Sequence, residues 1–206
     1  VAAADPTIEL GTRSELERVV ALARVRQAID LGDWDRGRRL AERLLEHTGD
    51  GAVRAQAEFY RGFAIWSAGD RESARPLLIA AMTEPQLEPK LAAMARLELV
   101  DAALIAGDHD RARELLVADV RIGTVDRRGA WPLLDARTKA AAAKLAIATG
   151  AADVEVRIAA ARGAFRDFVD MCARSHDPIG NAPFAVAPRR QLVDDILELC
   201  RNSAPD

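Results

Sequence analysis

Apolar residues recur every three or four positions along almost the whole chain, and short polar turns interrupt them. This spacing places the apolar side chains on one face of a helix. The first helix is predicted to begin near Ser14, with Glu17 three residues later completing a capping box. The predicted helices cover residues 14–31, 34–46, 52–67, a fourth ending near 83, 87–105, a sixth ending near 120, 131–149, 153–173 and 189–201.

Two stretches with proline depart from this pattern. Pro76 falls early in the fourth helix, where a proline is expected to kink the helix or delay its start. The segment up to Pro188 combines several prolines with glycine, so it cannot be helical throughout. We therefore divide the chain into an N-terminal extension (1–13), a helical repeat domain (14–175), a Pro-rich loop (176–188) and a C-terminal capping helix with its tail (189–206).

A Gly-Asp turn recurs between the predicted helices. Gly favours the left-handed conformation that ends one helix, and Asp caps the start of the next. Three turns share the dipeptide and a fourth is degenerate, at spacings of 37, 38 and 43 residues: Gly32-Asp33, Gly69-Asp70, Gly107-Asp108 and Gly150-Ala151. Regular spacing in this range predicts a stack of helical hairpins, in which no single hairpin buries its own apolar face.

Small residues around the second turn add a family resemblance. Gly62, Gly69, Ala74 and Ala81 match the positions at which tetratricopeptide repeats place small residues, so the chain resembles that family. The resemblance implies an all-α fold, a right-handed α-solenoid of about four antiparallel hairpins with a C-terminal capping helix. It also implies that the first helix of each hairpin lines a concave groove, in which a peptide or helix of a partner protein binds.

Composition supports the helical reading and excludes several classes of protein. Alanine, a strong helix former, occurs 42 times, whereas only nine residues are aromatic, too few for a β-sandwich or barrel. The net charge of −3 gives no basic field for nucleic acid. No apolar run reaches the roughly 20 residues that span a membrane. Because 26 of the 29 basic residues are arginine, the composition is typical of a bacterium with a GC-rich genome.

The start of the chain bears on its compartment. It begins at Val1 without a methionine, and no signal peptide is recognisable. We expect a truncated or processed chain. A cytoplasmic location is favoured, with an exported mature chain as the alternative.

The family register assigns residues to the concave groove. Phe59, Phe63 and Trp66 bring three of the nine aromatics to first-helix positions, where aromatic and arginine side chains commonly anchor partners. An alternative is that these aromatics only fill the core between hairpins. The full predicted groove comprises Arg26, Gln56, Phe59, Phe63, Trp66, Asp101, Arg137 and Lys144.

Candidate chemistry is sparse. Cys172 and His176 lie four residues apart on one helix face, and Cys200 could join them in a metal site or a thiol enzyme. Structural zinc sites need a second closely spaced pair, so we expect no metal, no cofactor and no catalytic residue. Whether the two cysteines pair stays open. The leading hypothesis is a non-enzymatic protein-interaction module or scaffold. The alternatives are a regulatory or sensor segment of a larger bacterial signalling or transcription protein, and a stack that self-associates through its end repeats.

Overall fold

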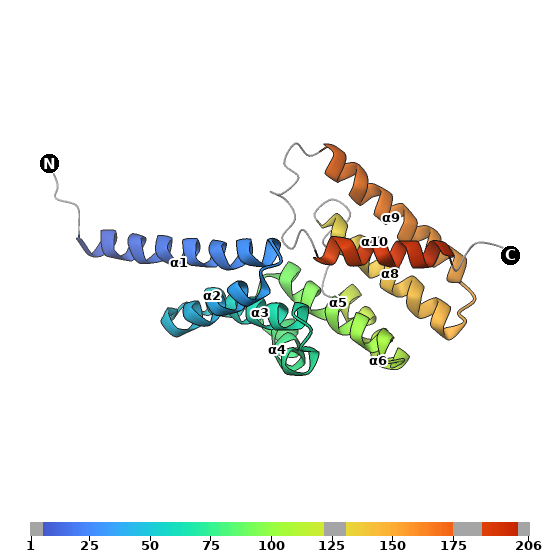
Figure 1. Ribbon diagram of the computed structural model, residues 1–206, viewed down its shortest axis with the longest axis horizontal. Coiled ribbons are helices and arrows are strands. Elements are labelled where there is room, and N and C mark those ends of the chain that lie inside the picture. Colours follow the sequence, from blue (N-terminus) through green and yellow to red (C-terminus); the bar gives the residue numbers. More distant parts are fainter. Residues whose placement is uncertain (1–5, 122–130, 175–186, 202–206) are drawn as a thin grey trace. The chain divides into compact units, whose positions relative to one another are not determined.

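Every element that the structure describes is an α-helix (Figure 1). The structure is a computed structural model that describes residues 6–121, 131–174 and 187–201, with side chains for 15–117, 131–173 and 192–201. This confirms the all-α prediction. The helices are α1 (Pro6–Asp30), α2 (Trp34–His47), α3 (Gly51–Ser67), α4 (Arg71–Thr83), α5 (Pro89–Ile105), α6 (His109–Arg121), α8 (Pro132–Thr149), α9 (Val154–Arg174) and α10 (Ala187–Arg201).

The predicted helix bounds agree with the structure to within a few residues, except at α1. That helix begins at Pro6, so Ser14 lies inside it and the predicted capping box is wrong. A proline suits the first turn of a helix, and Gly11 inside the helix costs only about 1 kcal/mol relative to alanine. Pro76 also lies inside its helix, α4. That helix begins at Arg71, directly after its N-cap residue Asp70, so the proline does not delay the start of the helix. Most of the Pro-rich loop, residues 176–186, lies outside the described residues.

The Gly-Asp turns are confirmed, and each one joins two helices with a minimum of chain. All four glycines adopt positive φ angles, between 64° and 102°. The residue after each glycine donates its N–H to the carbonyl five residues back, as in a Schellman motif: Asp33 to Ala28, Asp70 to Ile65, Asp108 to Ala103 and Ala151 to Ala146. Each Asp carboxylate then accepts the N–H three residues ahead, at 3.1–3.2 Å. One Asp therefore closes one helix and caps the next.

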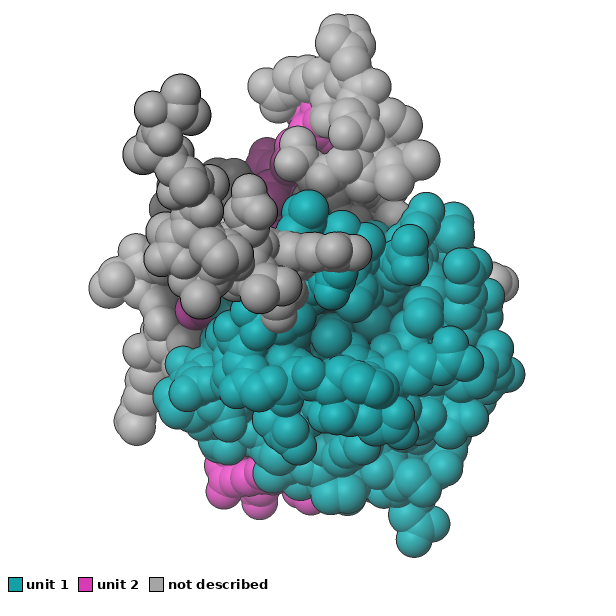
Figure 2. Space-filling view, turned by 90° about the vertical axis from the view of Figure 1, so that its left-hand side faces the viewer, with its two compact units in different colours: residues 1–88 teal, residues 89–206 magenta. Residues whose placement is uncertain are grey.

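The chain divides into two compact units, residues 1–88 and 89–206 (Figure 2). In unit 1, α1 packs on α2 and α3, α2 packs on α3, and α3 packs on α4. Glycines permit close approach at two of these contacts. A Cβ at Gly62 would lie 2.9 Å from the Cβ of Leu77, and one at Gly37 would lie 2.5 Å from the Cδ1 of Ile29. The small residue predicted at position 62 therefore serves the contact between α3 and α4.

Unit 2 is built around α8, which contacts α5, α6, α9 and α10. In the main core cluster of this unit, the fully buried residues of α8 are alanines, and larger side chains of α9 and α10 pack against them. The core comprises Ala136, Ala140, Ala143, Ile158, Ala161, Ala164, Phe168, Leu192, Ile196 and Leu199. The abundance of alanine thus corresponds to close packing of helices in this unit. Packed neighbouring helices in both units are consistent with a helical repeat.

Candidate functional site

The aromatics predicted to line a groove lie in the core of unit 1. Phe59 and Phe63 are 0% and 1% exposed, and Trp66 is 6% exposed. The rings of Phe59 and Phe63 lie 5.8 Å apart, and Trp34 meets Phe63 edge-on at 6.4 Å. The structure therefore brings Phe59 and Phe63 together in the way that the core-filling alternative describes. In this arrangement the two phenylalanines expose almost no surface to a partner protein. Binding of a partner by these residues stays a prediction.

The other two predicted groove residues of unit 1 reach solvent. The side chain of Arg26 on α1 is 44% exposed and lies 3.9 Å from the Asp30 carboxylate. Gln56 on α3 is half-buried. Neither lines the groove between α1 and α2 that is described below.

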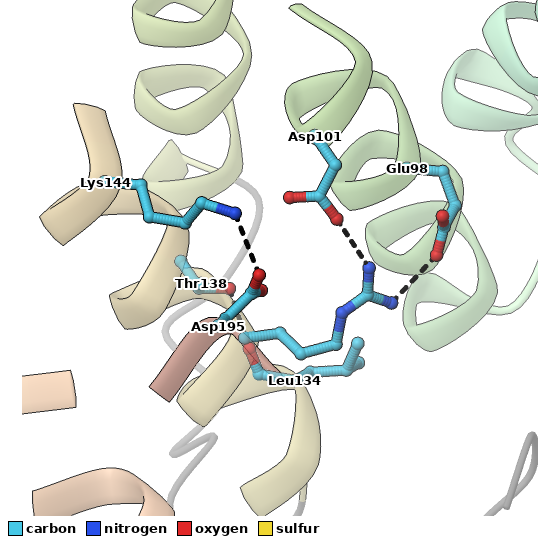
Figure 3. Close-up of polar contacts among 7 residues, drawn as sticks. Glu98, Asp101, Leu134, Thr138, Lys144 and Asp195 are labelled. Carbon is cyan, nitrogen blue, oxygen red and sulfur yellow. Dashed lines mark hydrogen bonds and ion pairs between the residues drawn. The ribbon is translucent and has the colours of Figure 1, made fainter. Parts of the chain in front are cut away.

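The predicted groove residues of unit 2 come together in a buried cluster of charges (Figure 3). Arg137 on α8 extends toward α5, where its guanidinium donates to Glu98 and to Asp101, each at 2.8 Å. All three side chains are 10% exposed or less. Sequence reasoning missed Glu98. The signal was available, because Glu98 and Asp101 are three residues apart and so share one face of the otherwise largely apolar helix α5.

A second ion pair ties α10 to the same region. Lys144 on α8 donates to Asp195 on α10 at 2.8 Å (Figure 3). The Glu198 carboxylate lies 3.6 Å from the same amine. Asp195 is buried and Lys144 is half-buried. Sequence reasoning missed Asp195 because nothing in the pattern of α10 shows which helix it packs against.

The cluster contains more buried acids than bases, and burial alters the ionisation of its members. Burial raises the pKa of Asp101 to about 6, against the opposing attraction of Arg137. Burial disfavours the charged Arg137, yet Glu98 and Asp101 outweigh it and raise the arginine pKa. Burial likewise opposes charge on Lys144, and Asp195 raises the lysine pKa. Both bases therefore stay protonated, and the pKa of Asp101 is raised well above its ordinary value.

The charged side chains of this cluster pair with one another across helices. The ion pairs of Arg137 join α8 to α5, and the ion pair between Lys144 and Asp195 joins α8 to α10, so the cluster fixes the three helices against one another. A hollow of about 330 Å³ opens beside Lys144 and Glu198, but its other walls are apolar, formed by Leu104, Ile105, Ile147 and Ala148. We assign the cluster a structural role.

An open groove lies between α1 and α2 in unit 1. It encloses about 360 Å³ and combines an apolar floor with a charged rim. The floor is formed by Ala21, Leu40 and Leu44, and the rim by Glu17, Arg18, Arg24, Arg43 and His47. The two helices lie close together near their turn, where a Cβ at Gly37 would meet the side chain of Ile29. The groove lies farther from the turn, beside Leu40 and Leu44.

Among the described residues, no ion pair neutralises the arginines on the rim of this groove. Arg24 and Arg43 are exposed and Arg18 is half-buried, and none of the three has an ion-pair partner among the described residues. By contrast, Arg38 on the same helix α2 is paired with Glu42 at 3.1 Å. This groove was not predicted from the sequence, because the excess of positive charge on its rim depends on which arginines face α1.

The metal and thiol alternative depends on three residues, of which the structure describes two. Cys172 and Cys200 are free thiols, half-buried and exposed respectively. His176 lies outside the described residues. Within the residues that the structure describes, no group of three histidine, cysteine or acidic side chains is placed to hold a metal ion.

Two general findings complete the description. None of the described helices combines the length and the apolar character needed to cross a membrane. Compared with known proteins, the chain matches no family model, no curated protein and no solved structure.

Proposed function

We propose that the chain is a non-enzymatic protein-interaction module, a stack of antiparallel helical hairpins similar to tetratricopeptide repeats, that binds a peptide or helix of a partner protein. The observation that carries the proposal is the groove between α1 and α2, with its apolar floor and arginine rim. Apolar surface supplies most of the free energy of association, and arginines are frequent anchors at protein interfaces. Repeated helical hairpins are commonly used to present such elongated surfaces.

The size of the groove suits a short helix. Its lining residues run from position 17 to 24 on α1 and from 40 to 47 on α2. At 1.5 Å per residue, each wall extends over roughly 10 Å, or two helical turns. A partner helix would place apolar residues at i, i+3, i+4 and i+7 on the floor.

The test measures binding of a panel of fluorescent peptides to the full chain by anisotropy. Three amphipathic helical peptides share one leucine face and differ in their polar face, which is Glu-rich, Lys-rich or Ser/Gln-rich. We expect saturable binding of at least one peptide. Ala21→Trp fills the groove and should weaken that binding at least tenfold. Ala23→Trp is the matched control, because Ala23 is exposed on the same helix and does not line the groove.

A second variant guards against a folding defect in the first. Leu40→Ser removes part of the apolar floor without adding bulk, and it should also weaken binding. Circular dichroism shows that each variant keeps its helical content. Absence of saturable binding for all three peptides contradicts the proposal, as does binding that neither Ala21→Trp nor Leu40→Ser reduces.

A further inference from the structure

The charge around the groove between α1 and α2 is strongly one-sided. Three arginines and only one glutamate line the groove around the apolar floor. This imbalance is local, because the whole chain carries a net charge of −3. It is also uncompensated, since Arg18, Arg24 and Arg43 form no ion pair with any described residue.

The arrangement of charges frames the floor from both helices. Arg18 and Arg24 come from α1, and Arg43 comes from α2, with Ala21 and Leu40 between them. A helix lying on the floor would therefore have arginines along both of its flanks. Carboxylates on those flanks would meet guanidinium groups, which bind carboxylates in a planar, two-pronged geometry.

We propose that the occupant of this groove is an acidic amphipathic helix, with leucine-like residues on one face and Asp or Glu on both flanks of that face. This inference rests on the interaction function proposed above. Charge complementarity with the three arginines favours this partner over a basic or neutral helix. The apolar floor favours it over a nucleic acid, whose backbone would satisfy the arginines and leave Ala21, Leu40 and Leu44 without apolar contact.

The experiment reverses the charge of the rim and follows peptide preference. The full chain is titrated with the Glu-rich, Lys-rich and Ser/Gln-rich peptides at two salt concentrations. We expect the Glu-rich peptide to bind at least tenfold more tightly than the Lys-rich one, with an advantage that shrinks at high salt. In the double variant Arg24→Glu, Arg43→Glu the preference should invert, so that the Lys-rich peptide binds more tightly.

Arg39→Glu is the matched control. Arg39 is exposed on α2 and does not line the groove, so its reversal should leave the preference for the Glu-rich peptide unchanged. A 20-nucleotide single-stranded oligonucleotide is included as a polyanion without an apolar face.

The outcomes separate this inference from the general function. Equal binding of the three peptides, reduced by Ala21→Trp, overturns the acidic partner and leaves the interaction function standing. Tighter binding of the oligonucleotide than of the Glu-rich peptide, lost in the double variant, also overturns the acidic helix. Absence of binding by every peptide overturns the inference together with the function on which it rests.

Discussion

At the scale of single residues, Asp101 has the most unusual environment. It shares Arg137 with Glu98 inside unit 2, and burial raises its pKa from 3.8 to about 6. Between these two pH values the folded chain holds a proton at Asp101 that the unfolded chain has released. The folded state therefore binds more protons in this range, and its free energy of unfolding falls as the pH rises from about 4 to about 6.

We predict that Asp101→Asn removes this part of the pH dependence. Asparagine carries no charge and still offers an oxygen to Arg137. The stability of the variant relative to the wild type should rise between pH 4 and pH 6 and then level off. At about 1.4 kcal/mol per pKa unit, the total change is on the order of 3 kcal/mol. Urea unfolding at several pH values measures it.

The control for this titration is Asp110→Asn, on α6. Asp110 is highly exposed and pairs with Arg113 three residues away. The difference in free energy of unfolding between Asp110→Asn and the wild type should change little over the same pH range, since exposed ion pairs contribute only about 0–1 kcal/mol. A difference for Asp101→Asn that is equal at pH 4 and pH 7 would contradict the assignment.

At the scale of elements, the contact between α3 and α4 depends on the missing side chain of Gly62. A Cβ there would lie 2.9 Å from the Cβ of Leu77, which is too close for two carbons. We predict that Gly62→Ala destabilises the fold, because overpacking costs about 1–3 kcal/mol. That cost exceeds the gain of at most about 1 kcal/mol in helix propensity. Denaturant unfolding measures the sum.

Gly163 provides the matched comparison for this substitution. It lies inside α9, and a Cβ there would have nothing within 4 Å. Gly163→Ala should therefore stabilise the fold by up to about 1 kcal/mol through helix propensity alone. If Gly62→Ala were equally stabilising, the close approach of α3 and α4 would not be the reason for the glycine.

The elements were largely predictable from sequence because their signals are local. Gly69 and Asp70 end one helix and cap the next through bonds that span at most five residues. The start of α1 was not predictable in this way, since Ser14 satisfies a capping pattern but lies within a continuous helix. A local signal of this kind shows where a helix can begin, and the surrounding chain decides whether it does.

The candidate sites were less predictable because they depend on distant residues. Arg137 meets Glu98 across 39 positions of sequence, and only the packing of α8 on α5 brings the two together. The rim of the groove likewise depends on which faces of α1 and α2 turn toward each other. Phe59 and Phe63 illustrate the same limit, since the sequence left open whether they fill the core or line a groove, and the structure buries both.

At the scale of the whole molecule, contacts divide the chain into residues 1–88 and 89–206. The continuous repeat domain expected over residues 14–175 stays a prediction. Each unit reaches its packing differently. Unit 1 concentrates aromatics around Phe59 and Phe63, whereas the core of unit 2 combines alanines of α8 with larger residues of α9 and α10. A low aromatic content is therefore compatible with two cores.

The ion pair between Lys144 and Asp195 has a kinetic consequence. Most helices pack on their neighbours in sequence, and chains with local contacts fold within microseconds to milliseconds. The ion pair between Lys144 and Asp195 instead joins two residues that are 51 positions apart in the sequence. We expect α10 to dock after the rate-limiting step. Asp195→Asn should then speed unfolding by roughly tenfold and leave the refolding rate unchanged in stopped-flow experiments. Its exposed neighbour Asp194 offers the control, and slower refolding of Asp195→Asn would place this docking before the barrier.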